Sequence, residues 1–363
     1  MSKFKILELF GGIGACSKAL ERLGIDYEIA DYVEIDKYAV KSFNAIHGTN
    51  FEPQDICKWD KDIKVDLIMQ GSPCQDFSLA GKQAGGDKDS GTRSSLMYET
   101  IRIVEKLKPK YVIWENVKNL LSKKHRHNFD AYLETMEQLG YTNYYQVLNA
   151  KDYGIPQNRE RVFTVSILKD VFVYDLPDNY KFRFPQKQEL KLKLKDMLED
   201  EVDERYYLSD KMVEYISADN EKWTGNNDKS IINKSVASAI NTGEGSRRCD
   251  ASNYISNQVE ENFNLKGSSY LRDFGSKGKI QNKEYCDTLT ASMGTGGGNV
   301  PIFQNNLRIR KLTPREVWRL MGFDDADFEK ASKVNSNSQL YKQAGNSIVV
   351  NVLEAILNNL LLN

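Results

Sequence analysis

The chain has 363 residues, of which 40% are hydrophobic and 28% charged, and its formal net charge is -1. This balance is typical of a globular protein long enough for one large domain with a second attached, and it excludes a disordered chain. No apolar run approaches the roughly 20 residues that cross a bilayer, and the first residues lead into a strand pattern rather than a secretory signal. We therefore expect a cytoplasmic protein with no membrane partner. The charge argues mildly against nucleic acid as a partner.

Five cysteines and three histidines are the candidate metal ligands. The cysteines are odd in number, widely spaced and without a C-x-x-C pair, which argues against both a disulfide framework and a zinc site. The histidines, His47, His125 and His127, lie in polar surroundings without metal-ligand spacing, and we expect them on the surface. The sequence therefore predicts no metal site.

The first residues read as a strand, a glycine turn, a helix and a second strand. Residues 4–10 alternate as a short strand, glycines follow at 11–14, and apolar residues then recur with helical spacing. This is the first unit of a nucleotide-binding α/β fold, although Ser17 replaces the third glycine of the dinucleotide fingerprint. The second strand, 27–33, ends at Glu34, about 20 residues past the last glycine, where a ribose hydroxyl would be held.

A third feature comes before the next strand. Asp55 would offer a carboxylate to an adenine amino group, and Ile56 would lie against the ring. Ligands of open α/β sheets bind where successive strands end. The glycine turn, Glu34 and the Asp55-Ile56 pair together favour an adenosine-type cofactor.

The stretch 71–78 carries a candidate nucleophile, Cys74, directly after the apolar run 65–69. A Pro-Cys step fixes the backbone and leaves a thiol at the rim of a sheet. The polar, glycine-rich segment 80–93 reads as a mobile loop, a candidate lid over the site. Glu115 ends another apolar run, and Arg159 and Arg161 follow later. A thiolate, a carboxylate and guanidinium groups can together attack, protonate and hold a flat polar ring.

The remaining pattern alternates helices with strands. We predict helices over 94–107 and 129–139 and strands over 111–114, 144–148 and 162–168, and hence an α/β fold with a mostly parallel sheet flanked by helices. Thr313 and Pro314 begin a later helix. Residues 343–347 open the last helix, whose single apolar stripe needs a sheet face to cover. The chain end should therefore return to the first domain.

Between these parts the composition changes to a loop-rich insert. We predict a catalytic domain of residues 1–168 plus 307–363 and a smaller inserted domain of residues 169–306. Basic residues dominate 266–283, which suits contact with a phosphate backbone.

These motifs, in this order, resemble those of the bacterial and phage C5-cytosine-specific DNA methyltransferases over nearly the whole chain. The matching blocks are residues 10–14, Glu34, 55–56, 73–75, 115–117, 157–161 and 345–347, with 287–298 similar to the end of the target-recognition domain. Two positions depart from the family pattern: Gly11 stands where many members have alanine, and Ile35 where an aromatic residue often stacks on adenine. The resemblance implies a Rossmann-like, class I methyltransferase fold dependent on S-adenosylmethionine, with an inserted target-recognition domain.

The resemblance also implies where the cofactor binds. S-adenosylmethionine would lie across the glycine turn, which holds no pyrophosphate and so can lack the third fingerprint glycine. The residues implied for the cofactor are Phe10, Gly12, Gly14, Glu34, Asp55, Ile56, Pro73, Asn346 and Ser347.

The implied reaction is transfer of a methyl group to cytosine C5 in double-stranded DNA. C5 is a poor nucleophile, and covalent addition of the Cys74 thiolate at C6 would activate it. Glu115 would protonate or hydrogen-bond N3, while Arg161, aided by Arg159, would bind the O2 edge or hold the cysteine loop. A base inside a duplex is out of reach, so it would be rotated out of the stack.

We further expect a monomer that serves restriction-modification or host or phage DNA protection, with or without a cognate restriction endonuclease that acts separately. The residues expected to contact DNA are Gln75, Ser78, Arg93, Arg272, Lys277 and Thr288. Two alternatives remain from the sequence: a tRNA cytosine-C5 methyltransferase and a catalytically silent DNA-binding regulator. The long insert favours duplex DNA over tRNA, and it would have no use in a small-molecule methyltransferase. The intact Cys74, Glu115 and Arg161 argue against a silent regulator.

Overall fold

The computed structural model of the chain describes residues 3–73, 96–174, 181–207, 209, 256–257, 286–287, 302–305 and 308–362. Its contacts divide the chain into two compact units. The first contains residues 1–149, 160–187 and 347–363, and the second contains residues 150–159 and 188–346. The C-terminal segment therefore belongs to the same unit as the N-terminal strand.

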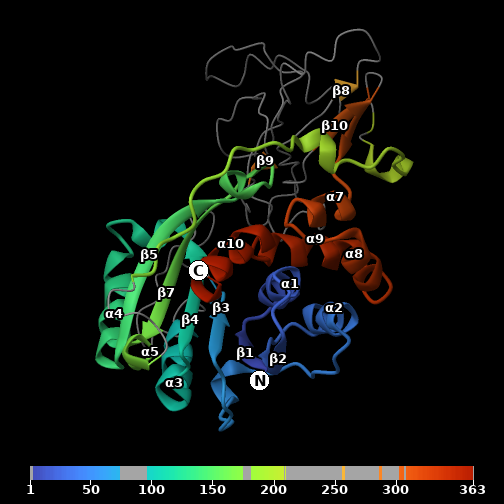
Figure 1. The fold of residues 1–363 in the computed structure, drawn as a ribbon. Coiled ribbons are helices and arrows are strands. Elements are labelled where there is room, and N and C mark those ends of the chain that lie inside the picture. Colours follow the sequence, from blue (N-terminus) through green and yellow to red (C-terminus); the bar gives the residue numbers. More distant parts are fainter. Residues whose placement is uncertain are drawn as a thin grey trace. The chain divides into compact units, whose positions relative to one another are not determined.

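A six-stranded sheet forms the centre of the first unit (Figure 1). Its strands are β1 (Phe4–Leu9), β2 (Tyr27–Val33), β3 (Leu67–Gln70), β4 (Tyr111–Val117), β5 (Tyr141–Asn149) and β7 (Glu160–Leu168). Their order is β2-β1-β3-β4-β7-β5, and β7 alone pairs antiparallel with both of its neighbours. The prediction of a mostly parallel sheet is confirmed.

Helices cover both faces of this sheet. They are α1 (Ala15–Arg22), α2 (Lys37–His47), α3 (Met97–Leu107), α4 (Arg126–Gln138), α5 (Lys169–Tyr174) and α10 (Val350–Leu361), with 3-10 turns η1 (Ile56–Lys58) and η3 (Lys118–Leu121). Alternation along β1 separates the two layers: Leu7 and Leu9 lie in one cluster with α3 and α4, whereas Glu8 between them contacts Ser17 of α1. The apolar stripe of α10 packs against α1.

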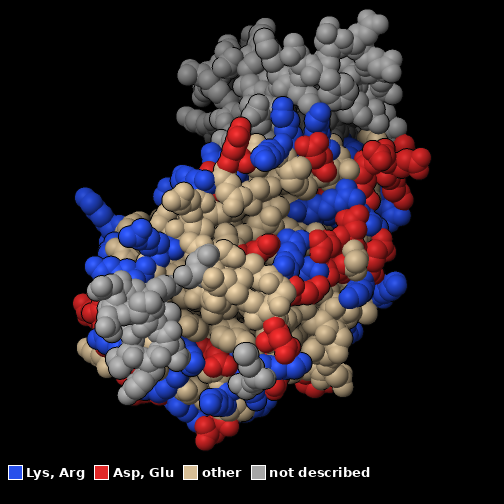
Figure 2. Space-filling view, viewed as in Figure 1, with Lys and Arg blue, Asp and Glu red and all other residues tan. Residues whose placement is uncertain are grey.

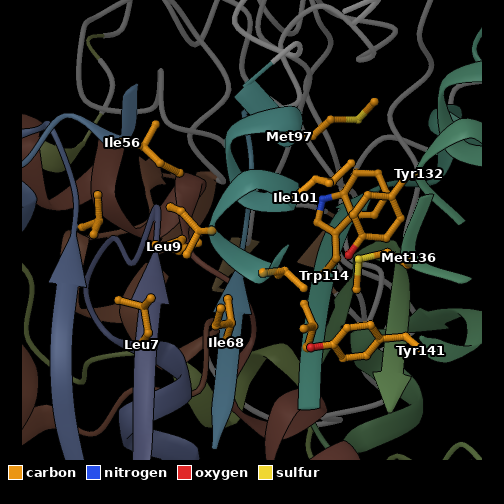
Figure 3. Close-up of a cluster of buried hydrophobic side chains, with 14 of the residues drawn as sticks. Leu7, Leu9, Ile56, Ile68, Met97, Ile101, Trp114, Tyr132, Met136 and Tyr141 are labelled. Carbon is orange, nitrogen blue, oxygen red and sulfur yellow. The ribbon is translucent and has the colours of Figure 1, made fainter. Parts of the chain in front are cut away.

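The main hydrophobic cluster lies between the sheet and the layer formed by α3 and α4. Figure 3 shows Leu7, Ile68 and Trp114 of the strands together with Tyr132 and Met136 of α4. The rings of Trp114 and Tyr132 have centroids 4.2 Å apart, and both side chains are fully buried. This cluster supports the strand ends from which the candidate site is built.

Several predicted boundaries differ from the structure. β4 continues to Val117 because its pairing with β7 extends to the register Val117 with Arg161. Residues 343–346 do not open the last helix: they are the final turn of α9 (Asn337–Asn346), and α10 begins at Val350. His125 is buried rather than on the surface, and it directly precedes α4.

The stretch Asn337–Leu361 is the only one among the described residues long and apolar enough to cross a membrane by length and composition. More than half of its most apolar part is buried inside the fold. The chain is also interrupted between α9 and α10. These features are typical of core helices.

The described residues of the second unit form short strands and turns followed by three helices. Its described elements are η4 (Ala150–Tyr153), β6 (Gln157–Asn158), η5 (Leu194–Met197), η6 (Glu204–Tyr206), β8 (Ser256–Asn257), β9 (Cys286–Asp287), β10 (Ile302–Asn305), β11 (Arg308–Lys311), α7 (Pro314–Arg319), α8 (Asp325–Ser332) and α9. The strands form two small sheets, β11-β10-β8 and β6-β9. The predicted start of α7 is confirmed, with Thr313 as cap and Pro314 in the first turn.

Candidate active site

The predicted residues of the first unit follow the ends of its parallel strands. Phe10 comes directly after β1, Glu34 directly after β2 and Pro73 shortly after β3, while Glu115 lies near the end of β4. Because parallel strands end at one edge of a sheet, these residues share that edge, where open α/β folds bind ligands.

The glycine turn between β1 and α1 has an unusual backbone. Gly12 and Gly14 have φ values of 56° and 83°, and Phe10 also has a positive φ of 54°. A side chain at Gly14 is excluded by space as well as by conformation, since its Cβ would lie 2.2 Å from Nε2 of His47. The hydroxyl of Tyr32 on β2 donates to the Gly12 carbonyl at 2.6 Å, which ties the turn to the neighbouring strand.

Glu34 lies directly against this turn. Its carboxylate accepts hydrogen bonds from the backbone N–H of Gly12 at 3.2 Å and of Asp36 at 2.8 Å. Burial raises the pKa of the Glu34 carboxyl, and these backbone donors oppose that rise. The neighbouring side chain, Ile35, is 71% exposed. A carboxylate and an open apolar surface therefore lie side by side in the sequence at the end of β2.

The segment that carries Asp55 and Ile56 is joined to the end of β2. The backbone N–H of Gln54 donates to the Glu34 carbonyl at 2.9 Å. Asp55 caps η1, where its carboxylate accepts from the N–H of Cys57 at 3.0 Å, and Ile56 is 5% exposed within the main cluster. The structure thus brings the glycine turn, Glu34 and Asp55 into one connected region.

These residues suit S-adenosylmethionine by their chemistry. The Glu34 carboxylate has lone pairs left to accept from a ribose diol, and a turn without side chains at Gly12 and Gly14 permits close approach of a ligand. Ile35 supplies an apolar surface of the kind a purine ring covers.

Glu115 and Arg161 come from neighbouring antiparallel strands, β4 and β7. Nε of Arg161 lies 3.0 Å from Oε1 of Glu115, and the two side chains are 16% and 12% exposed. The second polar contact of Arg161 is with its own strand, since Nη1 donates to the Glu160 carbonyl at 2.8 Å. The structure therefore brings together the predicted acid and one of the predicted arginines, separated by 46 positions in the chain.

Ser72 has a role that no motif in the sequence indicated. Its hydroxyl accepts from Nε1 of Trp114 at 2.9 Å, and Nδ2 of Asn116 is 3.4 Å from its carbonyl oxygen. Ser72 is 3% exposed and is two residues before Cys74 in the sequence. It therefore anchors the end of the β3 segment to the strand that carries Glu115.

Other predicted residues lie elsewhere or outside the described ranges. Arg159 belongs to the second unit, where it is 4% exposed and its Nη2 donates to the Gly345 carbonyl at 3.2 Å. Asn346 ends α9 in that unit and is exposed, whereas Ser347 is buried in the first unit. The predicted residues outside the described ranges are Cys74, Gln75, Ser78, Arg93, Arg272, Lys277 and Thr288, together with the segments 80–93 and 266–283.

Lysine, arginine, aspartate and glutamate side chains are mixed over the described residues on the face that Figure 2 shows. Within the described residues, oppositely charged side chains also pair, as Lys118 does with Glu160 at 3.0 Å. This distribution agrees with the net charge of -1.

Comparison with known proteins identifies the family of the chain. The chain matches the family described as C-5 cytosine-specific DNA methylase over residues 4–361. It is 42% identical to the type II methyltransferase M2.ScrFI of Lactococcus lactis subsp. cremoris over 98% of both chains. It is 32% identical to the orphan methyltransferase M.SPRI of Bacillus phage SPR, covering 99% of this chain and 98% of the relative.

Solved structures share the fold at lower identity. The S. pombe Dnmt2 methyltransferase superposes with a TM-score of 0.63 at 19% identity, covering 99% of this chain and 98% of that one. The Entamoeba histolytica methyltransferase EhMeth gives a TM-score of 0.64 at 16% identity, with 99% and 98% covered.

The six-stranded sheet and its helices define a class I, S-adenosylmethionine-dependent methyltransferase fold, as predicted. The chain belongs to the C-5 cytosine-specific DNA methylase family, and it is a DNA cytosine-C5 methyltransferase. The predicted family and enzyme class are therefore confirmed. Neither the tRNA methyltransferase nor the silent regulator is favoured by these findings.

Proposed function

We propose that the chain methylates C5 of a cytosine within a specific sequence of double-stranded DNA, through a covalent bond between Cys74 and C6 of a base rotated out of the duplex. The observation that supports this most is the contact between Glu115 and Arg161 at 3.0 Å. An acid and a guanidinium so close together suit the N3 and O2 edges of one cytosine ring.

The reaction begins with the Cys74 thiolate. Its lone pair forms the S–C6 bond, and the electrons of the C5–C6 double bond become available at C5. Glu115 donates to N3 and Arg161 to O2, so that both stabilise the electron-rich ring. S-adenosylmethionine, when bound, would supply an electrophilic methyl group, whose bond to the sulfonium sulfur breaks as its bond to C5 forms. The proton on C5 then leaves to a base, a proton transferred to N3 returns to Glu115, the C5–C6 double bond re-forms and the thiolate departs.

The residues proposed to hold S-adenosylmethionine follow β1, β2 and β3, begin η1, or end and follow α9. Glu34 accepts from the ribose, Asp55 from the adenine amino group, and Phe10, Ile35 and Ile56 contact the adenine ring. At the methionine end of the cofactor, the proposal assigns Pro73, Asn346 and Ser347.

The relatives favour a biological setting for this reaction. Several bear the name type II methyltransferase, and phage relatives bear the name orphan methyltransferase. We assign the chain to protection of cytoplasmic DNA, as a monomer, with or without a cognate endonuclease. Residues 169–306 form the target-recognition domain in this proposal. Its basic stretch 266–283 contacts the phosphate backbone, and the proposed DNA contacts are Gln75, Ser78, Arg93, Arg272, Lys277 and Thr288.

The covalent step is tested with Cys74→Ala. We expect no methyl transfer from tritiated S-adenosylmethionine to plasmid DNA, and binding of the cofactor within about twofold of wild type, because the thiol is needed only to activate the base. Retained turnover would rule out the covalent mechanism. Bisulfite sequencing of DNA from cells that express the wild type identifies the methylated sequence.

A second experiment traps the adduct. In an oligonucleotide with 5-fluorocytosine at the target position, C5 carries fluorine in place of the proton that must leave, so the S–C6 bond should persist. We expect a complex that survives denaturing electrophoresis with the wild type and is absent with Cys74→Ala. A wild-type enzyme that methylates unmodified DNA without forming this complex would contradict the adduct. For base rotation, 2-aminopurine at the target position should become more fluorescent on binding, because it leaves the stack.

A further inference from the structure

Asp31 is a buried carboxylate on β2 that the proposed reaction does not use. It is 3% exposed, three residues before Glu34. Three side chains donate to it: Trp59 through Nε1 at 2.7 Å, Lys61 through Nζ at 2.7 Å and Gln54 through Nε2 at 3.0 Å. A buried carboxylate is costly unless such partners satisfy it. Asp31 therefore binds one segment of the chain, residues 54–61, to β2 through these hydrogen bonds.

That segment has little regular structure of its own. Between the end of α2 and the start of β3 its regular element is η1, which is three residues long. A single 3-10 turn does not hold its shape alone. Side-chain hydrogen bonds take the place of strand or helix pairing here. Gln54 adds to them, because its Nε2 also donates to the Tyr32 carbonyl at 2.7 Å.

Arg102 of α3 holds the same segment through its backbone. Its Nη2 donates to the carbonyl of Ile56 at 3.0 Å and to that of Trp59 at 2.9 Å. Nε of Arg102 pairs with Glu99 at 2.8 Å, which fixes the orientation of the guanidinium. The turn that carries Asp55 is thus bonded to β2 by Asp31 and to α3 by Arg102.

We propose that Asp31 and Arg102 are positioning residues for the adenosine part of S-adenosylmethionine, which hold Asp55 and Ile56 at a fixed distance from Glu34. This inference rests on the cofactor site assigned under the proposed function. Neither residue touches the cofactor. Together they keep a segment with almost no secondary structure in the conformation that binds it, so that the cofactor does not have to order the segment.

The charge of Asp31 is part of the arrangement. Burial raises the pKa of its carboxyl, but the hydrogen bonds from Lys61, Trp59 and Gln54 outweigh burial and leave the pKa below its ordinary value. The folded protein therefore favours the ionised form of this carboxyl. An amide at position 31 would direct an N–H group toward the donors of Trp59, Lys61 and Gln54, which cannot accept it. Residues 54–61 would then lose part of their hydrogen bonding to β2.

The test compares Asp31→Asn and Arg102→Gln with wild type in steady-state kinetics. We expect the KM for S-adenosylmethionine to rise about tenfold in each variant, with kcat at saturating cofactor within about twofold and the KM for DNA unchanged. Arg102→Lys, which retains one donor group for the two carbonyls, should give an intermediate KM. Arg102→Gln also keeps the test informative if Asp31→Asn does not fold.

Lys106→Met is the matched control. Lys106 lies one turn further along α3 and pairs with Asp60 of the same segment, Nζ to Oδ1 at 2.6 Å, but this pair is exposed to solvent. We expect its kinetics to stay at the wild-type values, because exposed ion pairs contribute little.

Glu34→Ala separates failure of the inference from failure of the cofactor site. One outcome is that Glu34→Ala raises the KM for S-adenosylmethionine while Asp31→Asn and Arg102→Gln leave it unchanged. In that case the positioning role is wrong, and the proposed cofactor site is supported. If Glu34→Ala leaves that KM unchanged, the cofactor site is wrong and the inference fails with it. A lower kcat together with a rise in the KM for S-adenosylmethionine and in the KM for DNA, with a lower Tm, would show a general structural role. That result would overturn the positioning role.

Discussion

At the scale of single residues, the contact between Glu115 and Arg161 is the clearest chemical arrangement in the described part of the first unit. Each side chain is mostly buried, and each is held by a strand rather than a loop. Groups on strands are positioned more accurately than groups on loops, which suits a site that must hold a flat ring.

Glu115→Gln should lower kcat by about 10²- to 10⁴-fold, because an amide can hydrogen-bond N3 but cannot protonate it. Binding of DNA should stay close to wild type. Tritium transfer under single-turnover conditions measures the change. Glu160→Gln is the control, since Glu160 pairs with Lys118 at the surface and should leave kcat unchanged. A kcat for Glu115→Gln near that of the control would contradict the role of the acid.

Glu8 is a second buried acid, on the strand that leads into the glycine turn. Its carboxylate accepts from the N–H of Ser17 at 3.1 Å and from the Ser17 hydroxyl. Burial raises its pKa from 4.5 to about 7, although the hydrogen bonds from Ser17 oppose the rise. The folded protein therefore binds a proton at Glu8 more tightly than the unfolded chain does. The resulting penalty is absent below pH 4.5, grows as the pH rises and is complete above about pH 7.

Glu8→Gln should remove this pH dependence. Above pH 7 the variant should be more stable than wild type by up to roughly 3 kcal/mol, because the amide keeps an acceptor for Ser17 and carries no charge to desolvate. At pH 4.5 the difference should vanish. Urea unfolding at pH 4.5 and pH 8 measures both values. A stability difference that does not change with pH would show that the carboxyl does not titrate in this range.

At the scale of elements, local backbone features determine how α1 and α7 begin. The glycine turn before α1 has positive φ values, and α7 begins with a capping box in which the side chains of Thr313 and Glu316 each accept a hydrogen bond from the other residue's backbone N–H. Glu316 also receives both terminal nitrogens of Arg310, at 2.9 and 2.7 Å, in a fully buried pair. Each feature joins a helix to the strand before it.

Gly14→Ala and Gly24→Ala form a matched pair of substitutions. Both glycines have positive φ, 83° and 66°, so both variants should lose about 1 to 2 kcal/mol from conformation alone. Only at Gly14 would the new Cβ meet His47, whereas nothing lies within 4 Å at Gly24. Thermal unfolding should therefore show a larger loss for Gly14→Ala, and its KM for S-adenosylmethionine should rise. Equal effects of the two variants would contradict the clash.

Thr313→Ala should destabilise the protein by about 1 kcal/mol, the usual cost of losing a helix cap. The loss should be somewhat larger because the Thr313 hydroxyl also bonds to Glu199. Thr313→Ser retains the hydroxyl and should stay near wild type. Urea unfolding monitored by tryptophan fluorescence measures both variants. A stability of Thr313→Ala equal to that of Thr313→Ser would show that the cap contributes nothing.

At the scale of the whole molecule, the two compact units divide the proposed tasks. The six-stranded sheet and all the described strand ends of the cofactor region belong to the first unit. A ligand that binds there should stabilise that unit by mass action, by about 2.7 kcal/mol at a hundredfold excess over its Kd. This stabilisation can be located along the chain.

Hydrogen exchange with and without S-adenosylmethionine should show protection in the first unit. We expect it at residues 9–14, 31–36 and 54–59, because those backbone segments form the connected region around Glu34. Protection confined to residues 188–346 would contradict the proposed cofactor site. Added duplex DNA is the comparison, and it should protect the second unit.

The sequence alone predicted the succession of strands and helices along the chain, the glycine turn, the cap at Thr313 and the family. These follow from apolar periodicity, from backbone preferences of glycine and proline, and from motifs read in order, all of which involve residues near each other in the chain. The apolar stripe of α10 likewise predicted that the chain end returns to the sheet.

The tertiary structure alone decided which distant residues meet. Asp31 with Trp59, Ser72 with Trp114 and Glu115 with Arg161 are 28 to 46 positions apart. Such contacts depend on strand order, on the antiparallel pairing of β7 and on its register, and periodicity within one segment contains no information about them. For the same reason the burial of His125 escaped the sequence, because a polar sequence context does not show which layer of the fold covers a turn.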